Sequence, residues 1–128
     1  MREVIEASGA PAPIGPYSVG IATESLVFCA AQAGIDPETG SLVPGGTEAE
    51  IEQAMQNLAA VLAADGLTFA DVAKTTIFVV DIGEFGVVNR VYGRLMGDRP
   101  PARTTVGVAA LPIGARVEIE MIAVRRAG

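Results

Sequence analysis

Arg103 and the carboxylates that follow it are the residues of this sequence best suited to bind and transform a small anion. Arg103 lies in the segment Pro101-Ala102-Arg103-Thr104-Thr105-Val106, and Glu118 and Glu120 lie in the next apolar segment. The three charges fall out of step with the apolar alternation around them. Arginine's planar fork can hold a carboxylate through two parallel hydrogen bonds, and a nearby glutamate can handle a water or a proton. We therefore expect a site for a small anionic substrate.

The lack of histidine narrows the chemistry that this site can perform. The chain contains no histidine and one cysteine, Cys29. Serine–histidine and cysteine–histidine nucleophiles and histidine metal sites are thereby excluded within one chain, as are an intrachain disulfide and a thiolate cluster. The acidic residues are spread through the chain, so we expect no metal. Cys29 lies in an apolar strand pattern, where an inert buried thiol is expected.

Length and charge limit the class of protein. A chain of 128 residues predicts one domain, residues 1–128. A formal charge of −6 and few aromatic rings disfavour a nucleic-acid surface. No apolar run approaches the roughly 20 residues of a membrane span, and Pro11 and Pro13 precede any long apolar stretch, unlike a signal peptide. We expect a cytoplasmic protein that binds neither membrane nor nucleic acid.

The first half of the sequence predicts three strands and a helix. The strands are expected at residues 4–5, 17–22 and 26–35, with turns at 23–25 and 36–40. Thr47-Glu48-Ala49-Glu50 has the pattern of a capping box, which predicts a helix from about residue 48 to 65. Apolar residues at three- and four-residue spacing give this helix one buried face, made of Ile51, Met55, Leu58 and Leu62.

The second half predicts a strand, a helix and two further strands. A β-branched segment at residues 72–80 predicts a strand buried on both faces, and helical spacing returns at 84–96. The last strands are expected around 102–108 and 115–125. The order β-β-β-α-β-α-β-β favours an α+β fold, a six-stranded mixed sheet with both helices on one face. The other face then needs partner subunits, for which closed cyclic symmetry is the usual arrangement.

Six segments closely resemble the RidA/YjgF/UK114 family, and they span nearly the whole chain in order. They are Gly15-Pro16-Tyr17-Ser18, Cys29–Gln32 with Asp36–Gly40, Val72–Val79, Asn89-Arg90-Val91-Tyr92, Pro100–Val106 and Val117–Ala123. The resemblance implies a chorismate-mutase-like homotrimer with a cleft at each subunit boundary. It also implies an imine deaminase that hydrolyses 2-aminoacrylate and related enamine or imine acids to 2-oxo acids and ammonia, without a cofactor.

The resemblance also assigns roles to individual residues. Arg103 would hold the substrate carboxylate and Glu118 would position the water. The residues that would line the cleft are Tyr17, Asn89, Ala31 and Thr105, the last through its backbone. The family commonly has Ser-Gly-Gln where this chain has Ala30-Ala31-Gln32. The residues themselves agree with this chemistry, because an imine carbon is already electrophilic and its hydrolysis needs only orientation, a placed water and proton transfer.

Several alternatives remain open from the sequence. Arg103 could form a structural ion pair with Glu118 or Glu120, and Tyr17 could be a core or interface aromatic residue. The sole lysine, Lys74, is expected at an exposed strand position. The protein could also bind a small carboxylate such as a 2-oxo acid without turnover. An RNA-directed activity is a third hypothesis, and the acidic charge and the lack of histidine argue against it.

Overall fold

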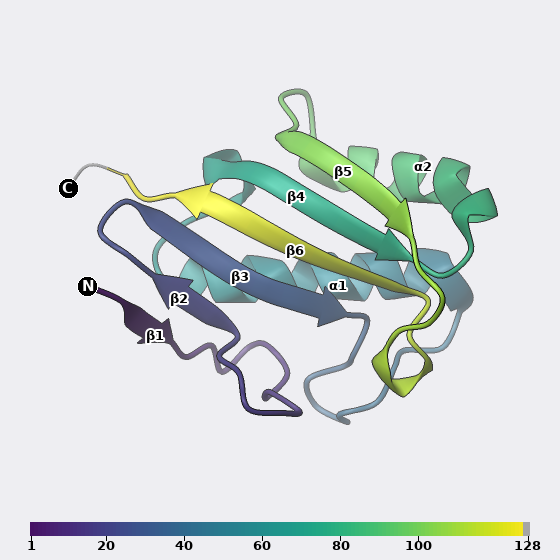
Figure 1. The fold of residues 1–128 in the computed structure, drawn as a ribbon, viewed down its shortest axis with the longest axis horizontal. Helices are drawn as coiled ribbons and strands as arrows, with labels where there is room; N and C mark the ends of the chain where they lie inside the picture. The colour runs from purple at the N-terminus through teal and green to yellow at the C-terminus, as the bar shows by residue number, and fades with distance from the viewer. Residues whose placement is uncertain (127–128) are drawn as a thin grey trace.

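In a computed structural model, which describes residues 1–126, the protein folds as a mixed sheet with two helices against one face (Figure 1). Within this range the elements are β1 (Glu3–Ile5), β2 (Gly20–Ala22), β3 (Leu26–Ala33), α1 (Gly46–Ala64), β4 (Val72–Val79), α2 (Phe85–Met96), β5 (Ala102–Gly107) and β6 (Val117–Val124). Short 3₁₀ helices are η1 (Phe69–Asp71), η2 (Ile82–Glu84) and η3 (Pro112–Gly114). The expected α+β order of six strands and two helices is confirmed.

The sheet order β1-β2-β3-β6-β4-β5 places the last strand in the middle. Only the β4–β5 pair is parallel among the paired strands of residues 1–126. Both helices lie behind the sheet in Figure 1, and the opposite face is uncovered. Side chains on the helix side, such as Ile77 and Ile119, are fully buried against α1 and α2, including Leu58 and Val88. The core therefore lies between the sheet and the helices.

The start of α1 differs from the expected capping box. The residue before the helix is Gly45 in a left-handed conformation, without a side-chain cap. Thr47 instead donates its hydroxyl hydrogen to Glu84, and the buried Glu50 accepts from the backbone N–H of Arg116 at 2.8 Å. The capping-box prediction was wrong because these two side chains bond to distant segments. The predicted helix itself, ending before Gly66 with φ 76°, is confirmed.

Two strand predictions need correction. The strand expected at 17–22 begins only at Gly20, because the proline-rich segment before it forms a loop that includes Tyr17. The strand expected to be buried on both faces, β4, is buried only on its helix side, and Lys74 and Phe78 on the other side remain partly exposed. Its outer face is the uncovered sheet face, so a lone chain leaves it in contact with solvent.

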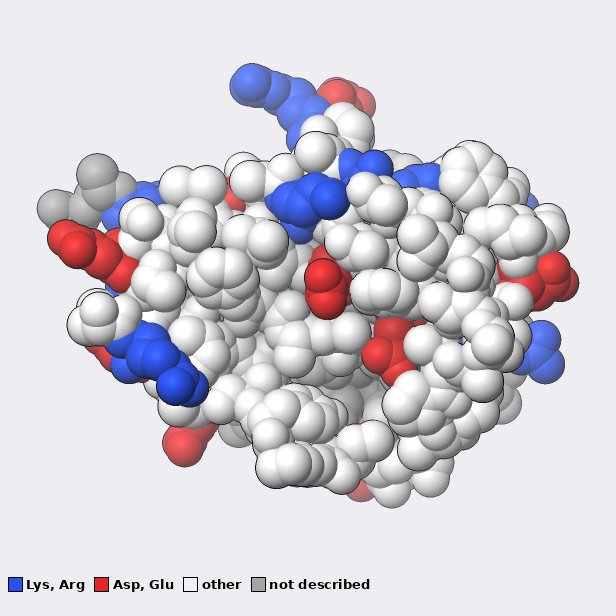
Figure 2. Space-filling model, viewed as in Figure 1, with Lys and Arg blue, Asp and Glu red and all other residues white. Residues whose placement is uncertain are grey.

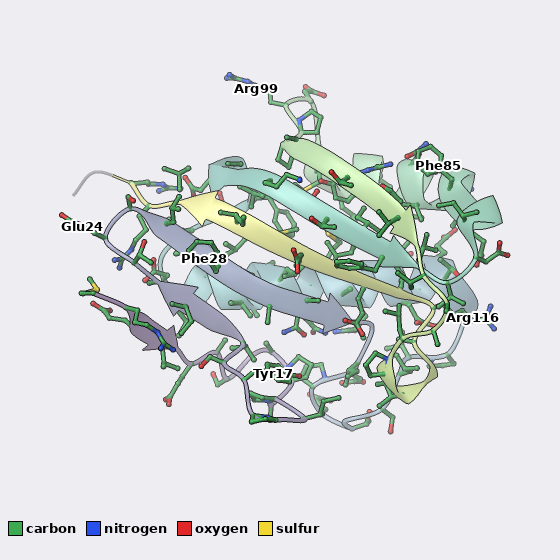
Figure 3. All side chains as sticks on the ribbon, viewed as in Figure 1. Tyr17, Glu24, Phe28, Phe85, Arg99 and Arg116 are labelled. Carbon is green, nitrogen blue, oxygen red and sulfur yellow. The ribbon has the colours of Figure 1, made fainter. Side chains whose placement is uncertain are left out.

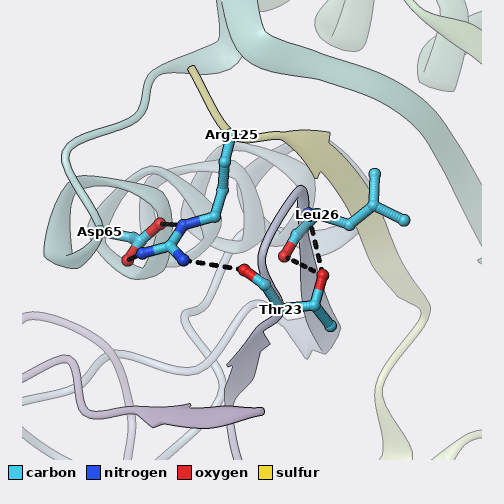
Figure 4. Close-up of polar contacts among 4 residues, drawn as sticks. All are labelled: Thr23, Leu26, Asp65 and Arg125. Carbon is cyan, nitrogen blue, oxygen red and sulfur yellow. Dashed lines mark hydrogen bonds and ion pairs between the residues drawn. The ribbon is translucent and has the colours of Figure 1, made fainter. Parts of the chain in front are cut away.

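Arg125 ties three distant segments together at one end of the sheet (Figure 4). Its guanidinium donates to both carboxylate oxygens of Asp65, at 3.0 and 3.1 Å, and to the carbonyl of Thr23 at 2.8 Å. The Thr23 hydroxyl in turn accepts the N–H of Leu26. The ion pair is largely buried, so removing one partner would leave an uncompensated charge. This end of the sheet is held within the chain, whereas the opposite end carries the candidate site.

Candidate active site

Arg103 is held in place by side chains of α2. The parallel register pairs Arg103 with Thr75, a buried residue, so the Arg103 side chain lies on the helix side of edge strand β5. Its guanidinium donates to Asn89 and lies over the rings of Tyr92 and Phe85, with 5.2 and 5.4 Å from guanidinium carbon to ring centre. The Tyr92 hydroxyl is anchored to Thr75 at 2.8 Å. The arginine fork is thus fixed before any ligand binds.

No carboxylate of residues 1–126 forms an ion pair with Arg103. Glu118 pairs with Phe78 across the sheet, and its neighbours on β4 and β6 show that it faces the uncovered side. Glu120 lies on that same side, two residues further on. Arg103 faces the helices, so a structural ion pair between Arg103 and either glutamate is ruled out within one chain. The positive charge of Arg103 remains available to an outside anion.

Glu118 lies at the edge of a hollow on the uncovered face. It is half-buried on β6, opposite Ala33 of β3, and burial raises the pKa of its carboxyl above the ordinary 4.5. Glu118 forms no ion pair with any of residues 1–126. A carboxyl group with a raised pKa exchanges protons more readily near neutral pH than an ordinary glutamate. Glu118 is therefore suited to proton transfer.

The hollow has a volume of about 290 Å³ and lies between the proline-rich loop, the end of β3 and η3. Tyr17 stands in the loop at its margin, about half exposed, and its hydroxyl oxygen accepts the N–H of Ile14 at 3.2 Å (Figure 3). Gln32, Tyr17 and Glu118 supply the polar side chains of the wall, and the other lining side chains are apolar. Such a mainly apolar concavity with a few polar groups is typical of small-molecule sites.

Ala30 and Ala31 form a β-bulge in the wall of this hollow. Cys29 pairs with Met121 and Gln32 pairs with Ile119, so two residues of β3 oppose one residue of β6. Bulges redirect side chains and are over-represented beside active sites. Ala31 has no positive φ, so its methyl group adds no backbone strain. Both alanines line the cavity.

Ile113 at the mouth of the hollow has an unfavourable backbone conformation. Its φ is 57° and its ψ 19°, and no other non-glycine residue of 1–126 has a positive φ. A left-handed conformation costs a residue with a Cβ about 1–2 kcal/mol, and a β-branched residue is a genuine outlier there. The side chain of Ile113 is 53 % exposed. Strain of this kind tends to occur where the surrounding structure or function holds it.

Three further candidates have different surroundings. The Thr105 hydroxyl, two residues from Arg103 on the same side of β5, is buried and has no hydrogen-bond partner in residues 1–126. Burial raises the pKa of the Cys29 thiol to about 12, so it stays protonated and unreactive. Lys74 lies partly exposed on the uncovered face. Of these three residues, only Thr105 lies beside a candidate site residue, Arg103.

The predicted site residues thus form two groups rather than one. Tyr17, Ala31 and Glu118 surround the hollow, and Arg103, Asn89 and Thr105 lie together between β5 and α2. The groups lie on opposite sides of the sheet. Sequence reasoning missed Phe85, Tyr92, Gln32 and Ile113 as site residues. The aromatic pair had a signal in its spacing on the helix with Asn89, whereas nothing in the sequence marked Ile113 as strained.

No group of three His, Cys, Asp or Glu side chains within residues 1–126 is arranged to hold a metal ion. In the same range, no helix is long and apolar enough to span a bilayer.

Comparison with known proteins identifies the family. A family model described as Endoribonuclease L-PSP matches residues 7–125. The mouse protein 2-iminobutanoate/2-iminopropanoate deaminase is 46 % identical over 98 % of this chain and 93 % of its own length. RidA from the Antarctic bacterium Psychrobacter is 37 % identical, with a TM-score of 0.93 over 96 % of this chain and 99 % of that chain.

E. coli TdcF, solved with bound serine, is 35 % identical, with a TM-score of 0.92 over 97 % of this chain and 99 % of that chain. Structures of this family thus share both the sheet and the helices described above. The chain belongs to the RidA/YjgF family and has its fold.

Proposed function

We propose that this protein hydrolyses 2-imino acids, including those formed from 2-aminoacrylate, to 2-oxo acids and ammonia. The observation that carries the proposal is Arg103, a guanidinium oriented by Asn89 and two rings yet unpaired with any carboxylate of residues 1–126. A 2-imino acid offers the missing carboxylate. Relatives at 41–46 % identity are named deaminases of this substrate class, which supports the proposal.

In the proposed reaction, water adds to the imine carbon and ammonia leaves. Arg103 binds the substrate carboxylate through two charge-assisted hydrogen bonds. Glu118 accepts a proton from the attacking water as the water oxygen bonds to the imine carbon, and it passes this proton to the nitrogen, which takes up the electron pair of the C=N bond. The tetrahedral intermediate then breaks its C–N bond as the hydroxyl proton moves to the leaving nitrogen, giving ammonia and the 2-oxo acid. The imine carbon is electrophilic without activation, so this sequence uses no metal and no cofactor.

The protein acts as a homotrimer in this proposal, with each cleft between two subunits. Arg103 and Glu118 lie on opposite sides of the sheet in one chain, so one substrate molecule meets both only if they come from different subunits. The uncovered sheet face favours such contact. Uncharged side chains surround the few charged ones on this face (Figure 2), and Phe28 is 42 % exposed there. Exposed apolar side chains of this kind are common at subunit interfaces.

A coupled assay tests the activity directly. A threonine dehydratase generates the imine in the presence of the purified protein, and faster appearance of the 2-oxo acid is the expected result. An unchanged rate across a wide range of protein concentration would favour instead a non-catalytic carboxylate-binding protein. Ala30 and Ala31 favour that second candidate, because the hydroxyl commonly found at this point of the family is missing.

Mixed trimers test the shared site. Arg103→Ala and Glu118→Gln subunits, each expected to have little activity alone, are unfolded, mixed in equal amounts and refolded together. Random assembly gives about a quarter of the clefts one intact Arg103 and one intact Glu118, so about a quarter of the wild-type activity should return. No recovery in folded trimers would place both residues in the same functional site of one chain. Light scattering that shows a monomer at micromolar concentration would contradict the trimer.

A further inference from the structure

We infer that Glu50 is a positioning residue for Glu118: it holds the start of β6 from the helix side and thereby sets where the Glu118 carboxyl group lies. Glu50 belongs to α1, on the other side of the sheet from Glu118, and the contacts that carry the inference lie within one chain. They do not depend on how the subunits assemble. The inference rests on the proposed function and adds to it the support of the proton-transfer group.

Glu50 is a buried carboxylate that binds a backbone group. Its exposed fraction is 4 %, and its Oε1 accepts the N–H of Arg116 at 2.8 Å. Its other oxygen, Oε2, lies 3.8 Å from Nε of Arg116, whose side chain is largely exposed. Burial of a carboxylate is costly, and a long ion pair to an exposed guanidinium offsets little of that cost. The stability of the fold does not by itself explain a carboxylate at this position.

The bonded N–H lies where an irregular turn becomes a strand. The turn residues Ile113 and Gly114 have positive φ values of 57° and 74°, and β6 begins just after Arg116. A strained turn keeps its conformation only where its surroundings determine it. The hydrogen bond from Arg116 to Glu50 supplies such a constraint at the end of this turn.

Arg116 is held at both of its backbone polar groups, two residues before Glu118. Its N–H donates to Glu50, and its carbonyl accepts the N–H of Val80, which follows β4, at 3.0 Å. Side chains alternate between the two faces along a strand, so a change of register or twist at Arg116 is carried directly to Glu118. The direction of the Glu118 carboxyl group therefore depends on how firmly Arg116 is held.

The same helix also holds β3 opposite Glu118. Ala33 of β3 pairs with Glu118, and the buried Asn57 of α1 donates to the carbonyls of Ala33 and Ile35 at 3.2 and 2.9 Å. Directly after Ala33, Gly34 lies so close to α1 that a Cβ there would be 2.5 Å from a backbone atom of the helix. The helix α1 thus fixes the end of β3 against the start of β6, where Glu118 lies.

Variants of Glu50 should separate turnover from binding. Glu50→Ala removes the acceptor of the Arg116 N–H, and kcat for 2-iminopropanoate should fall by about 10- to 100-fold, because a small displacement of a reacting group has a cost of this size. KM, and the Kd of pyruvate measured by calorimetry, should change by about 2-fold or less, because the contacts of Arg103 are untouched. Glu50→Gln keeps an acceptor oxygen for the N–H and should retain most of the activity.

Asp65→Ala is the matched control. Asp65 is also a largely buried carboxylate that binds an arginine, at the opposite end of the sheet. Its replacement should lower the Tm at least as much as Glu50→Ala and leave kcat per folded protein unchanged. An equal loss of kcat in both variants, or a loss in Glu50→Ala that only follows the fraction of folded protein, would overturn the inference.

If Glu50→Ala does not fold, Glu50→Asp decides. This variant keeps the charge and withdraws the carboxylate from Arg116 by one methylene group. A fall in kcat of about 3- to 10-fold with unchanged affinity for pyruvate is then expected, and full kcat would overturn the inference.

A double variant shows whether Glu50 acts through Glu118. In the Glu118→Gln background, Glu50→Ala should lower kcat by less than about 2-fold, because the group that Glu50 positions is already gone. A full additional loss in that background would overturn the inference, because Glu50 would then affect turnover by another route.

A crystal structure of Glu50→Ala separates the inference from the proposed function. The expected result is a displaced or doubled Glu118 side chain with Arg103 unmoved, and it requires no turnover. If the wild type hydrolyses no imine, a displaced Glu118 would support the positioning role and remove only the deaminase. An unchanged Glu118 would overturn the positioning role, whether or not the wild type is a deaminase.

Discussion

The two groups of site residues, one around Arg103 and one around Glu118, form two halves of the proposed site. They differ in how many contacts within one chain hold the central charged side chain. The Arg103 half is assembled: Asn89, Tyr92 and Phe85 fix the guanidinium, and Thr75 fixes Tyr92 in turn. The Glu118 half is an apolar hollow in which burial raises the pKa of the carboxyl group and no ion pair offsets it. The group that binds the anion is therefore held in place within one chain, whereas the proton-transfer group has a raised pKa and no partner that stabilises its ionised form. The predictions below test that division.

Replacing Arg103 should cause the largest loss. Arg103→Ala removes the carboxylate contact. The resulting fall in kcat/KM should correspond to a loss of about 3 kcal/mol or more in transition-state stabilisation. Arg103→Lys should recover little, because an ammonium cannot reproduce the planar fork over Tyr92 and Phe85. Coupled deamination, Tm and oligomer size are measured on the same samples. A folded, trimeric and fully active Arg103→Ala protein would end the assignment of Arg103 to the substrate.

Glu118→Gln should slow hydrolysis about 100-fold while leaving the binding of a 2-oxo acid largely intact. The amide keeps the shape of the side chain but cannot accept the proton of the attacking water. Steady-state kinetics and calorimetry with pyruvate separate the two effects. Loss of binding together with turnover would instead place Glu118 among the groups that hold the ligand.

The pH dependence follows from the raised pKa of Glu118. The carboxylate form is required for turnover, so activity should be lost as pH falls through a pKa above the ordinary 4.5, and Glu118→Gln should lack this acid limb. Stability depends on pH in the opposite direction from activity. Burial disfavours the ionised form in the folded protein, so Glu118 lowers stability as pH rises through this range. Glu118→Gln should accordingly be at least as stable as the wild type at pH 7.

The order of strands and helices along the chain and the buried helix faces follow from local patterns, which is why they could be predicted. The alternation in 117–124 and the spacing of Ile51 and Met55 survive in the fold as buried faces. The capping box failed because the same residues, Thr47 and Glu50, bond to segments far away in sequence. Opposite placement of Arg103 and Glu118 depends on the register of three paired strands, which no single segment determines.

Variants of Asn89 test whether this residue orients the Arg103 guanidinium. Asn89→Ala removes the hydrogen bond that the charged Arg103 donates to the neutral Asn89 amide. KM should rise moderately, by a factor that corresponds to about 1.5–3 kcal/mol of binding free energy at most. Asn89→Asp should do more harm than alanine, because its carboxylate would pair with Arg103 and compete with the substrate. KM for a 2-iminopropanoate series, read beside Tm, checks this order. Equal effects of both variants would mean that Asn89 does not orient the guanidinium.

The smallest expected effect concerns the bulge in the unassembled half. Ala30→Ser adds a hydroxyl to the wall of the hollow that Glu118 also lines, where it can order a water or the imine nitrogen, and it should raise turnover of 2-iminopropanoate by a few-fold, about 1 kcal/mol or less. Steady-state kinetics of the wild type and the variant on this imine check the prediction, with the Tm of both proteins as the control for folding. A fall in turnover with the fold intact would show instead that this wall of the hollow tolerates only apolar groups.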